Sequence, residues 1–217
     1  MNQKDLVLIG AGNCGREILW QLSESVISKK QYNILGFIDD TPVLQGTIIN
    51  GLHVLGNIQW LVNYKKDICA IICVGSSQGR KSIYNRLMEN HHIEFPTVVM
   101  EGVKCSDTIE FGQGCIICIS SILTINIAIG DFVLINYNSV VSHDTILEDY
   151  VTIYPSVNIS GNVHIGDCTE IGVGARVIEK RKIGANTIIG AGAVVCKDIP
   201  DNCTAVGIPA KPIIFHE

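Results

Sequence analysis

His143 and Asp144 stand next to each other in the sequence and form its best candidate for proton-transfer chemistry. An imidazole takes up a proton near neutral pH, and a carboxylate beside it can orient the ring. The pair therefore predicts a general base that activates an amine or hydroxyl group. A lone histidine is more often a structural residue, so this interpretation depends on the pattern that surrounds the pair.

A second group of residues suited to ligand binding forms the stretch Gly10-x-Gly12-x-x-Gly15. This glycine pattern alone is a weak phosphate signal. An apolar run at 6–9 precedes it and a helical stretch at 16–22 follows it. The N–H groups of residues 12–15 could therefore hold a pyrophosphate at the N-terminus of a helix.

The elements that must position these glycines alternate between strand and helix over the first hundred residues. Strands are expected at 6–9, 34–38 and 69–74, and helices at 16–22 and 80–88. This order predicts a small parallel sheet with helices on both faces. Ligands of such sheets bind at the carboxyl ends of the strands, which is where Gly10–Gly15, Asp39-Asp40 and Gly75-Ser76 fall.

The elements that must position His143 follow a different rule, because large apolar residues recur at every sixth position from Phe111 to Val195. A fixed period of six is the signature of a parallel β-helix, in which three short strands and three corners close one triangular coil of eighteen residues. The apolar residues stack along the axis. The glycines and asparagines at the corners are expected to adopt a positive φ; they include Gly130, Gly166, Gly172, Gly184 and Asn186.

Composition narrows the class of protein further. The chain has 217 residues, 47% of them hydrophobic and 17% charged, which excludes disorder. Its net charge of −5 offers no basic field for nucleic acid or anionic lipid. Two tight basic clusters, Lys65-Lys66 and Lys180-Arg181-Lys182, could hold phosphates or could be solvated turns.

The cysteines and the N-terminus bear on the location of the protein. The nine cysteines follow no disulfide framework, and Cys115-Ile-Ile-Cys118 has no partner pair, which favours thiols in a reducing compartment. The first residues lack the apolar region of a signal peptide, and no apolar stretch is long enough to span a bilayer. A cytoplasmic location is expected.

Three features together resemble one known family. They are the Gly-rich βαβ region, the repeats that carry Asn136-Tyr-Asn-Ser139 and Val141-Ser-His-Asp144, and the tail Ala205-Val-Gly-Ile-Pro-Ala-Lys211. The chain resembles, over almost its whole length, the sialic acid O-acetyltransferase and bacterial nucleotide-sugar N-acetyltransferase family of hexapeptide-repeat acyltransferases. The resemblance implies a Rossmann-like α/β domain at 1–98 and a left-handed parallel β-helix with a C-terminal tail at 99–217.

The same resemblance implies roles for residues of the β-helix. His143 would be the base, Asp144 would raise its basicity, and the N–H of Gly161 would hold the acetyl oxygen. Several relatives have a second histidine that contacts acetyl-CoA, where this chain has Thr152. Further coenzyme contacts are expected in a groove between the subunits of a homotrimer; they are Val173, Gly190 and Ala191.

The resemblance also implies an acceptor. Members of the family acetylate 4-amino sugars on nucleotide carriers for bacterial glycans, with acetyl-CoA as co-substrate and no metal. Relatives often have histidine where this chain has Cys14, and Asp39 and Asp40 match acids that recognise the nucleobase. The expected acceptor-binding residues are Gly12, Asn13, Cys14, Asp39, Asp40, Gly75 and Asn136.

Four alternatives stay open at this point. O-acetylation of sialic acid is the main one. An NAD-binding oxidoreductase would use the glycine-rich domain, but no catalytic domain remains once the β-helix is set aside. A metal-dependent hydratase would need three converging histidines, whereas the repeats contain only His143 and His164. A non-catalytic scaffold would not need a His-Asp pair at a corner.

Overall fold

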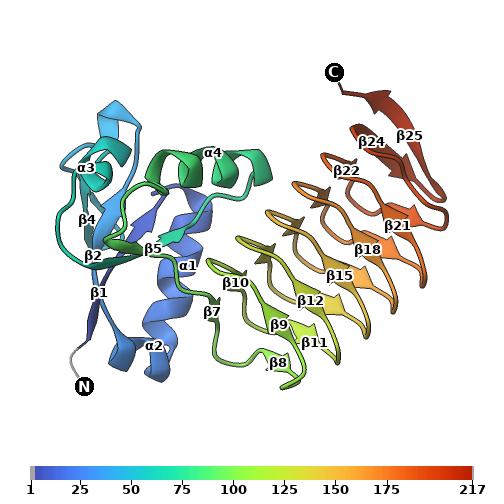
Figure 1. Cartoon of the computed structure of the whole chain (residues 1–217), viewed down its shortest axis with the longest axis horizontal. Coiled ribbons are helices and arrows are strands. Elements are labelled where there is room, and N and C mark those ends of the chain that lie inside the picture. Colours follow the sequence, from blue (N-terminus) through green and yellow to red (C-terminus); the bar gives the residue numbers. More distant parts are fainter. Residues whose placement is uncertain (1–2, 217) are drawn as a thin grey trace. The chain divides into compact units, whose positions relative to one another are not determined.

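The computed structural model describes residues 3–216 and divides the chain into two compact units, Met1–Pro96 and Thr97–Glu217 (Figure 1). The division lies close to the boundary after residue 98 that the sequence predicts. Within residues 3–216, no helix is long and apolar enough to cross a membrane.

The first unit is built on one sheet with the strand order β3-β4-β2-β1-β5-β6. All neighbouring pairs are parallel except β3 with β4. The neighbouring strands β1 and β5 are buried on both faces, β1 over its last four residues and β5 over all five, as expected for a parallel sheet. The strands are β1 (Lys4–Ile9), β2 (Tyr32–Ile38), β3 (Ile48–Ile49), β4 (Leu52–Gly56), β5 (Ile68–Ile72) and β6 (Ile93–Glu94).

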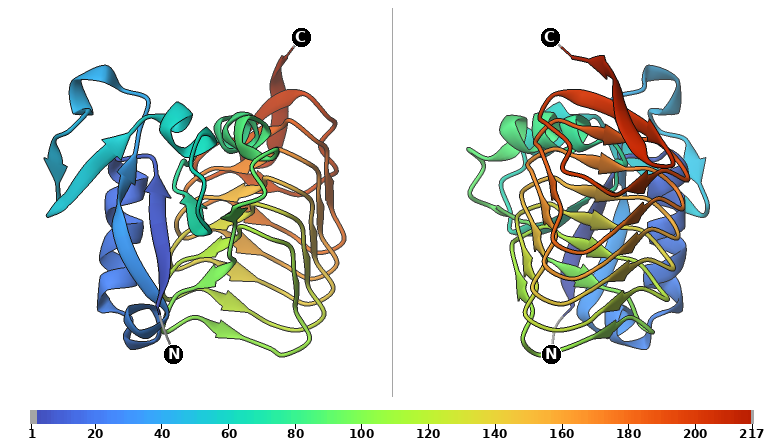
Figure 2. Two further views of the ribbon diagram at one scale, coloured as in Figure 1. Left: turned by 60° about the vertical axis from the view of Figure 1, so that its left-hand side comes forward. Right: turned by 90° about the vertical axis from the view of Figure 1, so that its right-hand side faces the viewer.

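Helices cover both faces of this sheet. The strand order reverses direction at β1, so right-handed connections put α1 on one face and α3 and α4 on the other (Figure 2). α1 and α4 begin at Asn13 and Ser77, earlier than the sequence indicates, because Gly12 and Ser76 act as their N-caps. The helices are α1 (Asn13–Glu24), α2 (Val26–Gln31), α3 (Ile58–Val62) and α4 (Ser77–Leu87), with a 3₁₀ turn, η1, at Pro42–Leu44.

The second unit is a left-handed parallel β-helix whose strands are mostly two residues long (Figures 1 and 2). Its strands form three sheets, here called sheets I, II and III. Sheet I contains β7 (Val98–Val99), β10 (Ile116–Ile117), β13 (Leu134–Ile135), β16 (Thr152–Ile153), β19 (Glu170–Ile171), β22 (Ile188–Ile189), β24 (Cys203–Gly207) and β25 (Ala210–Phe215). Sheet II contains β8 (Lys104–Cys105), β11 (Ile122–Leu123), β14 (Val140–Val141), β17 (Asn158–Ile159), β20 (Arg176–Val177) and β23 (Val194–Val195). Sheet III contains β9 (Glu110–Phe111), β12 (Ala128–Ile129), β15 (Ile146–Leu147), β18 (His164–Ile165) and β21 (Lys182–Ile183).

The axis of the β-helix is filled as the six-residue period predicts. Each strand from β10 to β23 turns its second residue inward, and every apolar residue of the six-residue series is buried except Phe111 at its start. Burying one such aliphatic side chain contributes about 2 kcal/mol. Buried hydroxyls beside the axis bond to carbonyl oxygens, as Ser139 does to Tyr154 at 3.1 Å and Thr169 to Gly184 at 2.6 Å. The axis is therefore apolar, and these buried hydroxyls are satisfied by backbone carbonyls, whereas Thr124 Oγ1 is a buried atom without a partner among residues 3–216.

At the corners of the β-helix, four glycines have a different role from the one that the sequence predicts. A positive φ recurs at every sixth residue, including Asn126, Asp144 and Asn186, but not at Gly130, Gly166, Gly172 or Gly184. The expectation for these four glycines is wrong. They are needed because the next coil comes too close for a side chain: a Cβ on Gly130 would lie 2.4 Å from Asp149 Oδ1.

Carboxylates of the corner between sheets III and I use the space that these glycines leave. Asp149 Oδ1 accepts a hydrogen bond from the Asp131 N–H at 2.8 Å, and Asp131 Oδ1 accepts one from the Gln113 N–H at 3.0 Å. Each bond joins residues eighteen positions apart. The aspartates thus satisfy corner N–H groups that the strand ladders leave unpaired.

Candidate functional site

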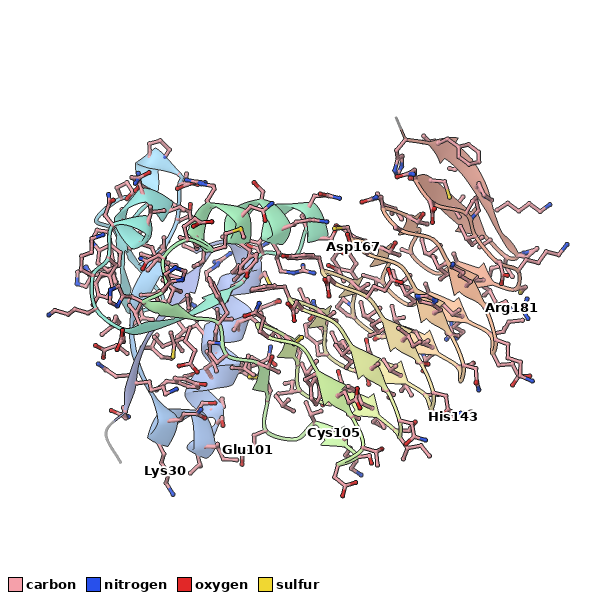
Figure 3. All side chains as sticks on the ribbon, in the orientation of Figure 1. Lys30, Glu101, Cys105, His143, Asp167 and Arg181 are labelled. Carbon is pink, nitrogen blue, oxygen red and sulfur yellow. The ribbon has the colours of Figure 1, made fainter. Side chains whose placement is uncertain are left out.

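His143 lies at the corner between sheets II and III, after β14 and before β15 (Figure 3). The chain turns there because Asp144 adopts a φ of 57°, and its N–H bonds to the Ile125 carbonyl at 3.2 Å. The His143 carbonyl in turn accepts a bond from the Asn162 N–H of the next coil at 2.9 Å. The backbone of His143 is therefore fixed from both sides, while its side chain is 52% exposed.

The imidazole is oriented by its neighbour in the chain. His143 Nδ1 lies 2.8 Å from Asp144 Oδ2, and Asn126 Nδ2 donates to the other carboxylate oxygen at 3.3 Å. The bond from His143, followed by that from Asn126, lowers the pKa of Asp144 below its ordinary value. An ionised Asp144 accepts a hydrogen bond from the N–H at Nδ1 of His143. This tautomer leaves Nε2 as the ring nitrogen able to take a proton from a substrate.

Gly161 supports the ring from the next coil. A Cβ on Gly161 would lie 2.3 Å from His143 Cε1 and 2.5 Å from Nε2, so only glycine allows the imidazole to lie here. The Gly161 carbonyl accepts a bond from the Lys180 N–H at 3.0 Å. Its own N–H has no acceptor among residues 3–216. A free donor beside a base is what an acyl-transfer site needs.

Three predicted coenzyme residues lie at another corner, between sheets I and II. Val173 is 51% exposed, and the N–H groups of Val173 and Ala191 have no acceptor within the described part of the chain. The N–H of Gly190 is used, because it bonds to the Ala205 carbonyl at 2.9 Å. Asn136 lies at this corner too, and its Oδ1 accepts from the Tyr137 N–H. Within one chain, the width of sheet II separates these residues from His143.

Thr152 lies at neither corner. It is the first residue of β16 in sheet I, where it pairs with Leu134 and Glu170, and its side chain is fully buried. The proposed contact of this hydroxyl with acetyl-CoA stays a prediction.

Three segments of the first unit that the sequence singled out lie at one edge of its sheet: Gly10–Gly15, Asp39-Asp40 and Gly75-Ser76. Ile9, the last residue of β1, pairs with Ile38 of β2 and Ile72 of β5, so the carboxyl ends of the three strands coincide. Gly10 turns the chain with a φ of 102°, and a Cβ on Gly15 would lie 1.8 Å from the Gly10 oxygen. The two glycines thus bring the start of α1 directly against the end of β1.

The N-terminus of α1 has the features of an anion site. Gly12 makes no side-chain cap, and the N–H groups of Asn13, Cys14 and Gly15 have no acceptor among residues 3–216. Arg16 donates to Asn13 Oδ1, which keeps a guanidinium beside this helix end. Burial raises the pKa of the Cys14 thiol to about 11, so it is neutral near pH 7. This end of α1 could hold a diphosphate.

Asp39 and Asp40 make structural bonds that the sequence did not reveal. Asp39 accepts from the N–H groups of Ala11 and Thr41 at 2.8 and 2.9 Å, and so ties the glycine-rich loop to the end of β2. Asp40 accepts from the Ile58 N–H at 2.9 Å and pairs with Arg86 at 2.6 Å. Partial burial raises the pKa of each aspartate, but these bonds outweigh it and hold the pKa below its ordinary value.

Arg80 is a residue of this edge that sequence reasoning missed. Its side chain is 1% exposed, and Nη1 donates to the carbonyls of Val74 and Gly75 at 3.0 and 2.9 Å. It fixes the turn between β5 and α4 that carries Gly75. One signal in the sequence could have indicated this role: Arg80 is a cation one helical turn after Ser76, the residue that caps the start of α4.

Comparison with known proteins accounts for both units. Residues 5–87 match the model of the PglD N-terminal domain family. WeeI from Acinetobacter baumannii AYE is 32% identical, and the alignment covers 97% of this chain and 100% of that chain with a TM-score of 0.86. The chain belongs to the bacterial nucleotide-sugar N-acetyltransferase family. The family and the fold that the sequence indicated are thereby confirmed.

Two further structures of similar proteins contain ligands. The acetyltransferase domain of PglB from Neisseria gonorrhoeae FA1090, in complex with acetyl coenzyme A, is 29% identical, with 98% of this chain and 100% of that chain covered and a TM-score of 0.86. A histidine-to-asparagine mutant of perosamine N-acetyltransferase from Caulobacter crescentus, in complex with CoA and GDP-perosamine, is 26% identical, with 97% of both chains covered and a TM-score of 0.87. A search of curated proteins found no match.

The structure thus brings the predicted residues of this acetyltransferase family member together in three groups. His143, Asp144 and Gly161 lie at one corner of the β-helix, and Val173, Gly190 and Ala191 lie with Asn136 at another, whereas Thr152 lies at neither. The acceptor residues of the first unit form the third. Residues 3–216 contain no group of three or more His, Cys, Asp or Glu side chains able to hold a metal ion.

The bonds of Asp39 predict a stability effect with a defined pH dependence. Asp39→Asn should lower the free energy of unfolding of the first unit at pH 7 by about 1–3 kcal/mol, because an amide cannot accept from both N–H groups. Since the folded pKa of Asp39 is lowered, this stabilisation is present above the ordinary aspartate pKa of about 3.9 and is lost as the pH falls through the folded value. Urea unfolding can be followed by tryptophan fluorescence, because both tryptophans, Trp20 and Trp60, lie in this unit.

Asp5→Asn is the matched control for this prediction. Asp5 is an exposed carboxylate in the same unit, and it accepts from Asn33 Nδ2 at 2.8 Å, which an amide oxygen can also do. Its variant should stay within about 0.5 kcal/mol of wild type. Equal unfolding midpoints for wild type and Asp39→Asn at pH 7, or a difference that grows as the pH falls below 4, would contradict the structural role of Asp39.

Proposed function

We propose that this protein transfers an acetyl group from acetyl-CoA to the amino group of a nucleotide-linked amino sugar, a 4-amino-deoxy sugar used for bacterial surface glycans. The observation that carries the proposal is the corner at which His143, oriented by Asp144, lies against the free N–H of Gly161. The ligands of the similar structures support it: acetyl coenzyme A in PglB, and CoA with GDP-perosamine in the Caulobacter crescentus enzyme. The cytoplasmic location stays a prediction.

The geometry suggests a direct reaction without an acyl-enzyme. The acceptor nitrogen attacks the thioester carbonyl, a C–N bond forms, and His143 Nε2 takes the proton that leaves the nitrogen. The Gly161 N–H stabilises the oxyanion, which is worth about 3 kcal/mol for one such donor. The C–S bond then breaks, and the imidazolium returns its proton to the sulfur, so coenzyme A leaves as its thiol.

A homotrimer would complete the site. Sheet II has the corner with His143 along one edge and the corner with Val173 and Ala191 along the other. If sheet II of each copy faces a threefold axis, the second corner of one subunit comes next to the first corner of its neighbour. The outer side of sheet II suits such an interface, because Ile122 is 40% exposed and Val140 and Val194 are partly exposed.

The acceptor is tested with a panel of sugars. Thiol release from acetyl-CoA should be fast with nucleotide-linked 4-amino sugars and at least about tenfold slower with the same sugars in free form, because the free end of α1 can bind a diphosphate. The product should carry an amide. Equal rates with free and nucleotide-linked sugars, or an ester formed on free sialic acid, would instead favour the sialic acid O-acetyltransferase alternative.

The roles of the corner residues predict a graded loss of activity. His143→Ala should lower kcat by about 10²–10⁴, the usual contribution of a general base, with little change in the binding of acetyl-CoA. Asp144→Asn should lower kcat less, because an amide oxygen can still accept from Nδ1 but carries no charge. Initial rates should give intersecting lines. Parallel lines, or an acetylated cysteine found by mass spectrometry, would indicate a covalent intermediate and contradict the role given to His143.

The trimer predicts different effects for two exposed isoleucines. Ile122→Glu, on sheet II, should turn the trimer into monomers and abolish activity, because three carboxylates would be buried around the axis. Ile146→Glu is the control: Ile146 holds the equivalent position on sheet III and is 45% exposed. Sedimentation velocity should find a trimer for wild type and for the control. A trimer that survives Ile122→Glu would mean that sheet II does not face the axis.

A further inference from the structure

A line of cations begins one coil beyond Gly161, on the corner that carries His143. The Lys180 N–H bonds to the Gly161 carbonyl at 3.0 Å, so Lys180 lies on the coil after the proposed oxyanion donor, next to Glu179, the residue eighteen positions after Gly161. Lys197 belongs to the next coil, because it follows β23, and β23 pairs with β20. Both lysines are exposed. From coil to coil, this corner therefore presents first a base, then a bare glycine, then Glu179 with Lys180, and then Lys197.

The two lysines are the cations of this corner that have no internal partner. Within residues 3–216, no carboxylate lies at ion-pair distance from Lys180 or Lys197. Arg181, in contrast, is engaged: Nη1 lies 3.7 Å from Asp198, and Nε donates to the Glu179 carbonyl. Residues 179–182 and 197–198 together hold four cations and two carboxylates, so the corner is locally positive on a chain with a net charge of −5.

We propose that Lys180 and Lys197 bind the pyrophosphate of acetyl-CoA. Successive coils are about 4.8 Å apart, so the two lysines lie on the order of 10–14 Å along the axis from His143. The extended pantetheine arm between the thioester and the pyrophosphate spans about 15 Å, at roughly 1.2 Å per bond of an extended chain. A donor with its thioester at His143 and its arm along the corner brings its phosphates to these ammonium groups.

This inference rests on the proposed function for the identity of the donor, and it adds a reason why the protein would require coenzyme A instead of a shorter thioester. The lysines supply the charge that an acidic protein otherwise lacks for binding an anionic donor. Because both ammonium groups are exposed, the attraction should weaken with added salt.

The test compares two donors on the full-length protein. In the Lys180→Gln/Lys197→Gln double variant, the KM for acetyl-CoA should rise about tenfold, the scale of two exposed ion pairs. The KM for S-acetylpantetheine, which has no phosphate, should stay at the wild-type value. Calorimetry with CoA and with pantetheine gives the same comparison without turnover, so a failure of the proposed acetyl transfer can be distinguished from a failure of the lysines to bind phosphate.

Lys182→Gln is the matched control. Lys182 belongs to the same basic cluster and is exposed, but it lies on β21 of sheet III, beside His164 in the ladder. Its variant should bind CoA as wild type does. The proposal is overturned if the double variant binds CoA normally, if it weakens CoA and pantetheine equally, or if Lys182→Gln has the same effect as the double variant.

Discussion

The backbone ladder that pairs the residues of successive coils, eighteen positions apart over most of the β-helix, is the constraint on which the rest of this unit depends. The carbonyl of His143 is held by Asn162, and the carbonyl of Gly161 is held by Lys180. Aliphatic side chains stacked on the axis hold this register, because a shift by one residue would turn them outward. The position of each reactive group therefore follows from its place in the repeat, and no separate loop is needed to hold it.

Close approach between coils makes room for a side chain at two corners. At the corner of sheets III and I, the absence of a side chain on Gly130 admits the Asp149 carboxylate, which pairs with a backbone N–H. At the corner of sheets II and III, the absence of a side chain on Gly161 admits the imidazole of His143. In both cases a glycine of one coil makes room for a side chain of an adjacent coil, so the two residues depend on each other.

The sequence predicted the features that are periodic or local, namely the β-helix, the βαβ order and the His143–Asp144 pair. It could not predict which atoms the long-range folding brings together. The sequence indicates that Asp39 binds a ligand, yet its carboxylate also accepts a hydrogen bond from the Ala11 N–H. The buried Arg80 donates to backbone carbonyls, a contact that no spacing pattern in the sequence reveals. The corner glycines were misjudged because the sequence shows that a corner exists but not how near the next coil lies. The binding roles of these residues remain predictions.

The length of the β-helix can also change without a change in the proposed site. The residues of the proposed site occupy consecutive levels, with His143 on one, Gly161 on the next, and Lys180 and Lys197 beyond. Duplication of a whole coil after Lys197 would extend the solenoid without altering any of these neighbours, since each coil contacts only the two beside it. Insertion of an unrelated coil between His143 and Gly161, in contrast, would put a new residue against the imidazole. Evolution can thus lengthen or shorten this protein at one end, whereas the boundary between these two coils is fixed.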